Sequence, residues 1–193
     1  MPDFIPFISY AIITTFTPGP NNITSMINSS RVGLRKGIKF NIGIFIGFTV
    51  VMLLCGAFGA VLAEYIPAVK PYLVYVGAGY ILWLAYKIFK SEYKEADDEG
   101  SAMYGFKEGI SLQFVNPKVI LFGITILSTF IVPYYNRGEI LLFALFLAVM
   151  AFASTITWAL FGSMFHKLFI KKTKLMNTIM AALLVYTAVT IVI

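Results

Sequence analysis

Two polar runs interrupt apolar stretches, and they hold the residues that could do chemistry in this chain. Residues 17–22 read Thr-Pro-Gly-Pro-Asn-Asn, and residues 114–118 read Phe-Val-Asn-Pro-Lys. Proline removes a backbone donor and clashes with the preceding turn, so each run should end one helix and begin another. Asparagine adds a short amide that can donate or accept a hydrogen bond. We refer to these runs as the first and second breaks.

The two breaks predict a site for a zwitterion such as an amino acid. Proline is favoured in the first turn of a helix, so Pro20 and Pro117 should each start a half-helix whose free N–H groups suit an anion. The half-helices that end at the breaks should leave free carbonyl groups, which suit an ammonium group. The alternative is that both breaks are kinks satisfied by neighbouring helices.

The predicted site divides into side chains that bind and residues that shape the backbone. The expected polar contacts are Asn21, Asn22, Asn116 and Lys118. The residues expected to shape the backbone are Pro18, Gly19, Pro20 and Pro117. Lys118 is the one charge well inside an apolar span, which favours a functional role. Its expected partner is the substrate carboxylate or an acid such as Glu108, and the alternative is that it reaches out to the membrane surface.

The composition requires a membrane around these elements. Of 193 residues, 59% are hydrophobic and only 12% are charged, and the mean hydropathy is +0.84. Soluble domains carry about 25% charged residues. The net charge of +6 lies in short clusters between apolar spans, so we expect no nucleic-acid partner. The chain shows no phosphate loop, metal-ligand spacing or nucleophile motif, so we expect no cofactor, no metal and no enzyme activity.

Six apolar segments are long enough to cross a bilayer as helices, which needs about 20 residues. They cover residues 4–27, 42–63, 71–89, 110–132, 140–165 and 175–193, and the first and fourth contain the breaks. Gly43 and Gly47 should permit close helix packing. The sequence therefore predicts an all-α membrane protein that crosses the bilayer several times.

The distribution of charge predicts how these segments are organised. Residues 1–90 form a first three-helix repeat, residues 91–104 a cytoplasmic linker, and residues 105–193 a second repeat. Three helices per half make the repeats inverted about an axis in the membrane plane. Basic residues concentrate in the loops after the odd-numbered helices, so those loops should be cytoplasmic and both termini outside.

The motifs at the breaks, together with Gly33-x-x-x-Gly37 and Arg35 between them, resemble the LysE/RhtB family of amino-acid exporters. The resemblance covers nearly the whole chain. It implies a six-helix inner-membrane exporter driven by the membrane's ion gradient rather than by ATP. Residues 51–55 and 111–116 look closer to the branch that exports cysteine and O-acetylserine, whereas Pro117 follows the general family pattern, and homoserine or threonine stays open as a substrate.

The function expected is export of a small neutral amino acid or derivative by alternating access around the two breaks. Its partners would be the amino-acid substrate and the lipid bilayer, with a homo-oligomer possible. The alternative is a non-transporting membrane interaction subunit, which would need the breaks only for packing. A cavity that meets both breaks would favour transport.

Overall fold

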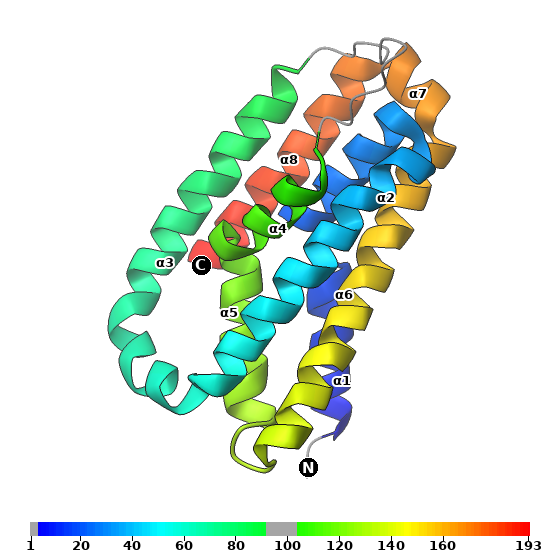
Figure 1. Ribbon diagram of the computed structural model, residues 1–193. Coiled ribbons are helices and arrows are strands. Elements are labelled where there is room, and N and C mark those ends of the chain that lie inside the picture. The colour runs from blue at the N-terminus through cyan, green and yellow to red at the C-terminus, as the bar shows by residue number, and fades with distance from the viewer. Residues whose placement is uncertain (1–3, 92–103) are drawn as a thin grey trace.

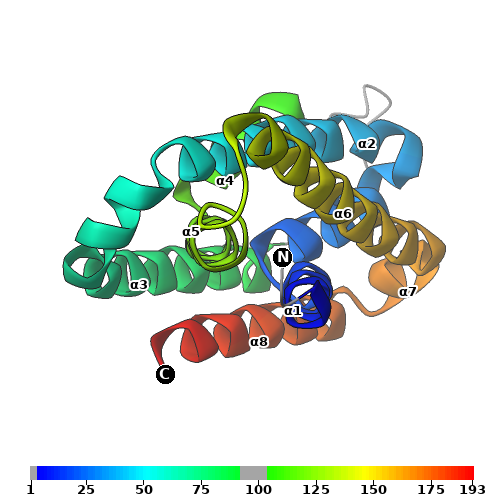
Figure 2. The same ribbon diagram turned by 90° about the horizontal axis from the view of Figure 1, so that it is seen from below.

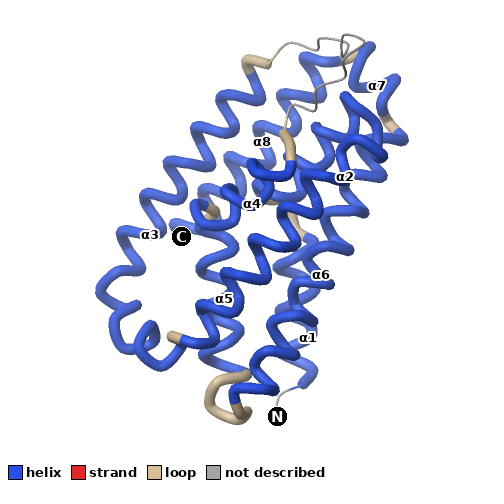
Figure 3. Tube along the Cα trace, viewed as in Figure 1, coloured by secondary structure: helices blue, strands red, loops and turns tan. Residues whose placement is uncertain are grey.

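The computed structural model describes residues 4–91 and 104–193, with the backbone alone given for residues 59–70. The described residues form helices joined by short loops, without a strand (Figures 1 and 3). The helices are α1 (Phe4–Phe16), α2 (Pro20–Ala57), α3 (Gly59–Phe89), α4 (Phe106–Val115), α5 (Pro117–Phe130), α6 (Arg137–Met164), α7 (His166–Lys171) and α8 (Thr173–Val192). The prediction of an all-α protein is confirmed.

Four of the described helices are long and apolar enough to cross a membrane: Pro20–Ala57, Pro71–Phe89, Arg137–Met164 and Thr173–Val192. The bent pair α4 and α5, which meet at 62°, makes a fifth candidate, and α1 is a shorter apolar helix. Both predicted breaks exist, one between α1 and α2 and one at Asn116. The count of six spans and the inverted repeats stay predictions, and residues 92–103 of the predicted linker lie outside the described residues.

The prediction of a loop at residues 28–41 is wrong. These residues form two helical stretches that meet at a single reversal of the chain. At Gly33 the backbone has φ 75° and ψ 163°, a conformation that side chains other than hydrogen rarely allow. There the chain doubles back, so that an added Cβ at Gly37 would lie 3.4 Å from the Cα of Ser29. Residues 20–32 are hereafter the first limb of α2 and residues 34–57 the second (Figure 1).

Residues 64–70, which were predicted as a loop, are also helical, because α3 begins at Gly59 inside the predicted second segment, residues 42–63. The fifth and sixth predicted segments match α6 and α8 to within three residues at either end. Gly43 and Gly47 pack against α4, as predicted. A Cβ added at Gly43 would lie 3.2 Å from the Cα of Gly109. A Cβ added at Gly47 would lie 2.9 Å from the Cγ of Gln113.

The first limb of α2 is the centre of the bundle. Every residue from Asn22 to Ser30 is buried, and six of these nine are Asn, Ser or Thr. Seen from below, α5 lies between α2 and α3, and α1 lies between α6 and α8 (Figure 2). This arrangement brings both breaks to the middle of the molecule.

The basic segments gather at one end of the bundle. The reversal of α2, the end of α3 and α7 lie there, whereas α1 begins at the opposite end (Figure 1). This is the arrangement that the charge distribution favours for a cytoplasmic end, and we refer to it as the basic end.

Candidate functional site

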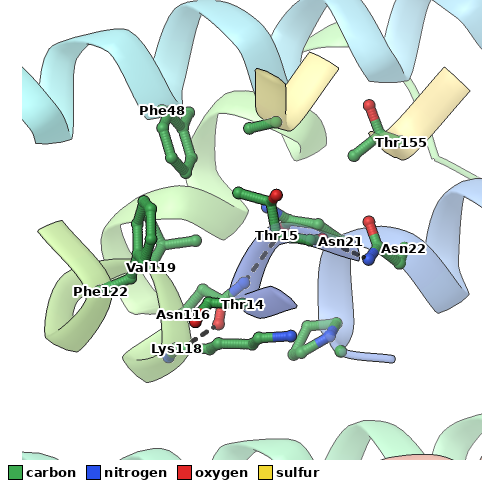
Figure 4. A pocket seen from close by; sticks show the side chains of 13 residues that line it. Thr14, Thr15, Asn21, Asn22, Phe48, Asn116, Lys118, Val119, Phe122 and Thr155 are labelled. Atoms are coloured by element: carbon green, nitrogen blue, oxygen red, sulfur yellow. Dashed lines mark hydrogen bonds between the residues drawn. The ribbon is translucent and has the colours of Figure 1, made fainter. Parts of the chain in front are cut away.

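The two breaks touch each other through side-chain amides. The Asn21 Nδ2 donates to Gln113 Oε1 at 2.7 Å, and the Asn21 Oδ1 accepts from Gln113 Nε2 at 3.0 Å. The same oxygen accepts from Asn116 Nδ2 at 3.1 Å, directly across from the second break. Asn21 therefore ties the start of α2 to α4 and to the second break (Figure 4).

Lys118 crosses in the opposite direction, from the second break to the first. Its Nζ donates to Thr17 O and Thr17 Oγ1, both at 2.9 Å, and to Pro18 O at 3.2 Å. Glu108 is not its partner, because that carboxylate accepts from Gly105 N at 2.9 Å instead. The ammonium lies at the carboxyl end of α1, where the helix dipole favours a cation.

At the first break, the carbonyl groups at the end of α1 already accept hydrogen bonds from side chains, so the expectation of free carbonyl groups is wrong there. Asn22 Nδ2 donates to Thr15 O at 2.8 Å and to Thr17 O at 2.9 Å. Ser154 Oγ donates to Thr15 O at 2.8 Å. These carbonyls were expected to be free for a substrate ammonium, but buried backbone acceptors in a membrane need partners from the protein.

Further donors to the same segment come from α6 and α8. Trp158 Nε1 donates to Phe16 O at 3.2 Å, and Thr187 Oγ1 donates to Pro18 O at 3.0 Å. With Gln113 and Ser154, these are the residues near the breaks that sequence reasoning missed. In the sequence each of them stands out only as a polar side chain in an apolar span, and this does not predict which part of the structure the side chain contacts.

The two half-helix N-termini differ from each other. At α5 the Asn116 Oδ1 accepts from Lys118 N at 3.1 Å and so caps the helix. At α2 the residue before the helix is Gly19, and no side chain caps it. The expectation of two open N-termini is therefore wrong for α5, and only the start of α2 offers uncapped N–H groups to a ligand.

A cavity lies where the breaks meet (Figure 4). The four predicted polar contacts and two predicted backbone residues line it, namely Asn21, Asn22, Asn116, Lys118, Gly19 and Pro20. Its other walls come from Thr14, Thr15, Phe48, Val119, Phe122, Ala151 and Thr155. Its volume is about 40 Å³. Water needs about 10–15 Å³ on this measure, so the cavity suits a few waters and must widen for a larger molecule.

Pro18 and Pro117, the other two predicted backbone residues, lie outside this lining. Pro117 packs beneath α3, where an added Cβ at Gly77 would overlap its ring. Pro18 lines a neighbouring cavity of about 360 Å³ between α1, α5 and α8. Thr14, Lys118 and Phe122 line both cavities and so form the partition between them.

Gly19 allows Lys118 to occupy this position. A Cβ added at Gly19 would lie 3.0 Å from the Cδ and 3.1 Å from the Nζ of Lys118. The glycine has φ −176°, an extended conformation open to any residue. Its importance here therefore lies in the space that it leaves for the lysine.

Comparison with known proteins supports the resemblance noted in the sequence. The chain is 41% identical over 189 residues to the cysteine/O-acetylserine efflux protein of Klebsiella pneumoniae subsp. pneumoniae, which covers 97% of this chain and 95% of that protein. It is 42% identical over 188 residues to the protein of the same name from Salmonella typhimurium, covering 96% and 95%. The Escherichia coli K12 protein of that name is 39% identical over 186 residues, again covering 96% and 95%.

No solved structure matches the chain. The sequence profile described as LysE type translocator matches residues 12–193, which is nearly the whole length. Together with the apolar helices, this makes the protein a multi-pass protein of the inner membrane. The chain belongs to the LysE-type translocator family.

Proposed function

We propose that this protein exports small neutral amino acids, with cysteine and O-acetylserine as the first candidates. The relatives that match this chain over nearly their full length are named cysteine/O-acetylserine efflux proteins. The observation that carries the proposal is the cavity where the uncapped start of α2, the asparagine amides and Lys118 converge. A transporter is also favoured over an enzyme or a passive subunit, because the family is one of translocators.

The carboxylate of the substrate has two sources of attraction in this cavity. The uncapped N–H groups of Asn21 and Asn22 carry the positive end of the α2 dipole. Lys118 adds a full positive charge, and an ammonium–carboxylate hydrogen bond is about twice as strong as a neutral one. Lys118 would then exchange one or more of its carbonyl partners at the first break for the carboxylate.

The remainder of the substrate meets amides, hydroxyls and apolar groups. The hydroxyls of Thr15 and Thr155 can accept from an ammonium group. Phe48 and Phe122 form an apolar wall, and no Asp or Glu lines the cavity. A small neutral side chain fits this wall, whereas a second cation would be buried without a partner.

Exchange of the Lys118 partners also suggests how the site opens. Lys118 separates the cavity at the breaks from the cavity of about 360 Å³ that lies beyond it between α1, α5 and α8. When the lysine leaves Thr17 and Pro18, the two spaces join and the substrate can leave away from the basic end. The chain carries no ATP-binding loop, so the ion gradient of the membrane is the proposed driving force.

The direct test measures efflux from cells that lack their own exporters of cysteine. Overexpression of this protein should raise external cysteine and O-acetylserine, and the Asn21→Ala variant should lower both toward the level of the empty vector. Asn21 is chosen because it joins the breaks through three hydrogen bonds. External levels that do not differ from the empty vector, at normal protein amounts in the membrane, would reject the proposed function.

A further inference from the structure

A separate cavity lies between α2, α3 and α4, on the side of the breaks that faces the basic end. Its volume is about 240 Å³, against about 40 Å³ for the cavity at the breaks. Its walls include Thr24, Tyr80, Trp83, Lys87, Tyr104 and Glu108. Small-molecule sites begin at about 300 Å³, so this space is close to the size that a single amino acid requires.

Two hydroxyl groups in its walls have no hydrogen-bond partner among the described residues. Thr24 is only 2% exposed, and its Oγ1 is one of these groups. The hydroxyl of Tyr104 is the other, although the backbone of Tyr104 is fixed by Asn28, which donates to its carbonyl at 3.0 Å and accepts from its N–H at 3.2 Å. Buried hydroxyl groups in native proteins are nearly always paired, so these two are candidates to pair with a polar ligand. Buried side-chain groups of Ser25, Ser29 and Asn41, which lie outside this cavity, also have no partner among the described residues.

The charges on the walls match a zwitterion. Lys87 lies on α3, with its Nζ 5.2 Å from the centre of the Trp83 ring and 5.8 Å from that of Tyr104. Glu108 lies on α4 and uses Oε2 to accept from Gly105 N. An amino acid could place its carboxylate toward the lysine and its ammonium toward the glutamate, with its side chain against the aromatic rings.

The cavity is also adjacent to the breaks along the first limb of α2. Thr24 lines this cavity and Asn21 lines the cavity at the breaks. Residues three apart on a helix lie on the same face and about one turn from each other. We propose that the cavity between α2, α3 and α4 is a second substrate site, which takes the zwitterionic amino acid from the basic end before it moves one helical turn to the breaks.

This inference rests on the proposed function, and a transport assay in inside-out membrane vesicles tests the two separately. In such vesicles the basic end, if cytoplasmic, faces the medium, and export appears as uptake of labelled O-acetylserine. In the double variant Lys87→Gln/Glu108→Gln the KM should rise about tenfold while the maximal rate stays within about twofold, because the charges act before the breaks.

The matched control is Lys90→Gln/Glu139→Gln, which should keep the KM of the wild type. Lys90 is also on α3, with its Nζ 5.8 Å from the Tyr86 ring, and lies outside the cavity. Glu139 accepts from Asn136 N at 2.9 Å, as Glu108 does from Gly105 N, so both glutamates play the same part at a helix start. Unchanged KM in the cavity variant, with active wild-type vesicles, rejects the second site alone. Wild-type vesicles without uptake reject the proposed function.

A binding measurement covers the case in which the double variant accumulates poorly. Trp83 lines this cavity and lies outside the lining of the cavity at the breaks. O-acetylserine should change the tryptophan fluorescence of the purified Trp158→Phe variant, which keeps Trp83 as its one tryptophan, in a saturable way. The absence of such a signal would overturn the inference.

Discussion

Lys118 shows how one residue can couple the two breaks. A lysine at the centre of a membrane helix costs about 2.5–3.5 kcal/mol on insertion scales. Here Thr17 and Pro18 offset this cost with three oxygens at the negative end of α1. Because these oxygens belong to uncharged groups, they do not neutralise the lysine, which can attract a substrate carboxylate.

Replacing Lys118 by Met should abolish export or reduce it strongly while the protein level stays near normal. The variant removes a costly charge, and the acceptors keep other donors, since Asn22 still donates to Thr17 O and Thr187 to Pro18 O. Efflux of O-acetylserine and an immunoblot of membranes measure the two effects. Lys107→Met, outside the cavity, is the control. Full export by Lys118→Met would remove the lysine from the site.

Gly19→Ala should reduce export about tenfold without loss of protein, because the new methyl group pushes Lys118 from its position. The predicted separation of 3.0 Å from Cδ is tighter than ordinary van der Waals contact. The control is Gly79→Ala, since an added Cβ there meets no atom within 4 Å. Transport rates per amount of protein in membrane vesicles make the comparison. Equal rates in the two variants would show that the space at Gly19 does not matter.

At the residue scale the sequence predicts which side chains converge but not what they bind. Lys118 stood out as a charge within an apolar span, and Asn21 as an amide beside a proline. Lys118 donates to the backbone carbonyl of Thr17, 101 residues away, and a backbone acceptor cannot be recognised from the type of residue in the sequence. Glu108 was the nearest acid in the chain, yet it caps the start of its own helix.

At the scale of elements, the first limb of α2 explains why one predicted loop is a helix. The predicted loop began at Asn28, after the apolar run ends, and held four basic residues; yet Asn28, Ser29 and Ser30 continue the helix and are buried in the bundle. The prediction succeeded for α6 and α8, where apolar runs are long and end cleanly. It failed near Gly33, because a reversal within a helical segment needs only one residue with positive φ.

Gly77→Val should destabilise the protein by about 1–3 kcal/mol, the usual cost of overpacking. Any Cβ at this position overlaps the Pro117 ring, and a proline at the start of α5 cannot move aside without disturbing the second break. The midpoint of thermal unfolding in detergent, followed by size-exclusion chromatography, should fall. Gly79→Val lies on the same helix in open space and should leave the midpoint unchanged. Equal midpoints would mean that α3 is free to shift.

At the scale of the whole molecule, the two breaks behave as a related pair. In each, the residue after the proline crosses to the other break, Asn21 to Asn116 and Lys118 to Thr17. This exchange is what inverted repeats would produce, with each half-helix meeting the other at mid-membrane. The repeats themselves stay a prediction, because apolar helices share residue types by chance and comparing the two halves of one sequence does not establish them.

Reporter fusions after Lys172 and at the C-terminus should give opposite signals, cytoplasmic for the first and external for the second. The expectation follows from the basic end, where α7 and the reversal of α2 lie together (Figure 1). The same signal from both fusions would overturn the orientation, and with it the assignment of the cavity between α2, α3 and α4 to the cytoplasmic side.

The choice of substrate depends on the whole arrangement of the cavity at the breaks. Asn21, Asn22 and Lys118 can hold the α-carboxylate, and the apolar wall of Phe48 and Phe122 then meets the side chain. A second cation buried there without a partner would cost several kcal/mol. We therefore expect small neutral compounds to be preferred over lysine and arginine by more than about a hundredfold.

Competition in inside-out vesicles measures this preference directly. Unlabelled cysteine, O-acetylserine, homoserine and threonine should reduce uptake of labelled O-acetylserine, each at a concentration far below that needed for lysine or arginine. Homoserine and threonine test how far the site reaches beyond the substrates named for the relatives. The absence of an acid from the cavity wall is the physical reason for this preference. Phe122→Glu, which places a carboxylate there, should therefore lower the concentration of lysine that is needed to compete with O-acetylserine. Competition by lysine as strong as by O-acetylserine in the wild type would show that the pocket is not built as described.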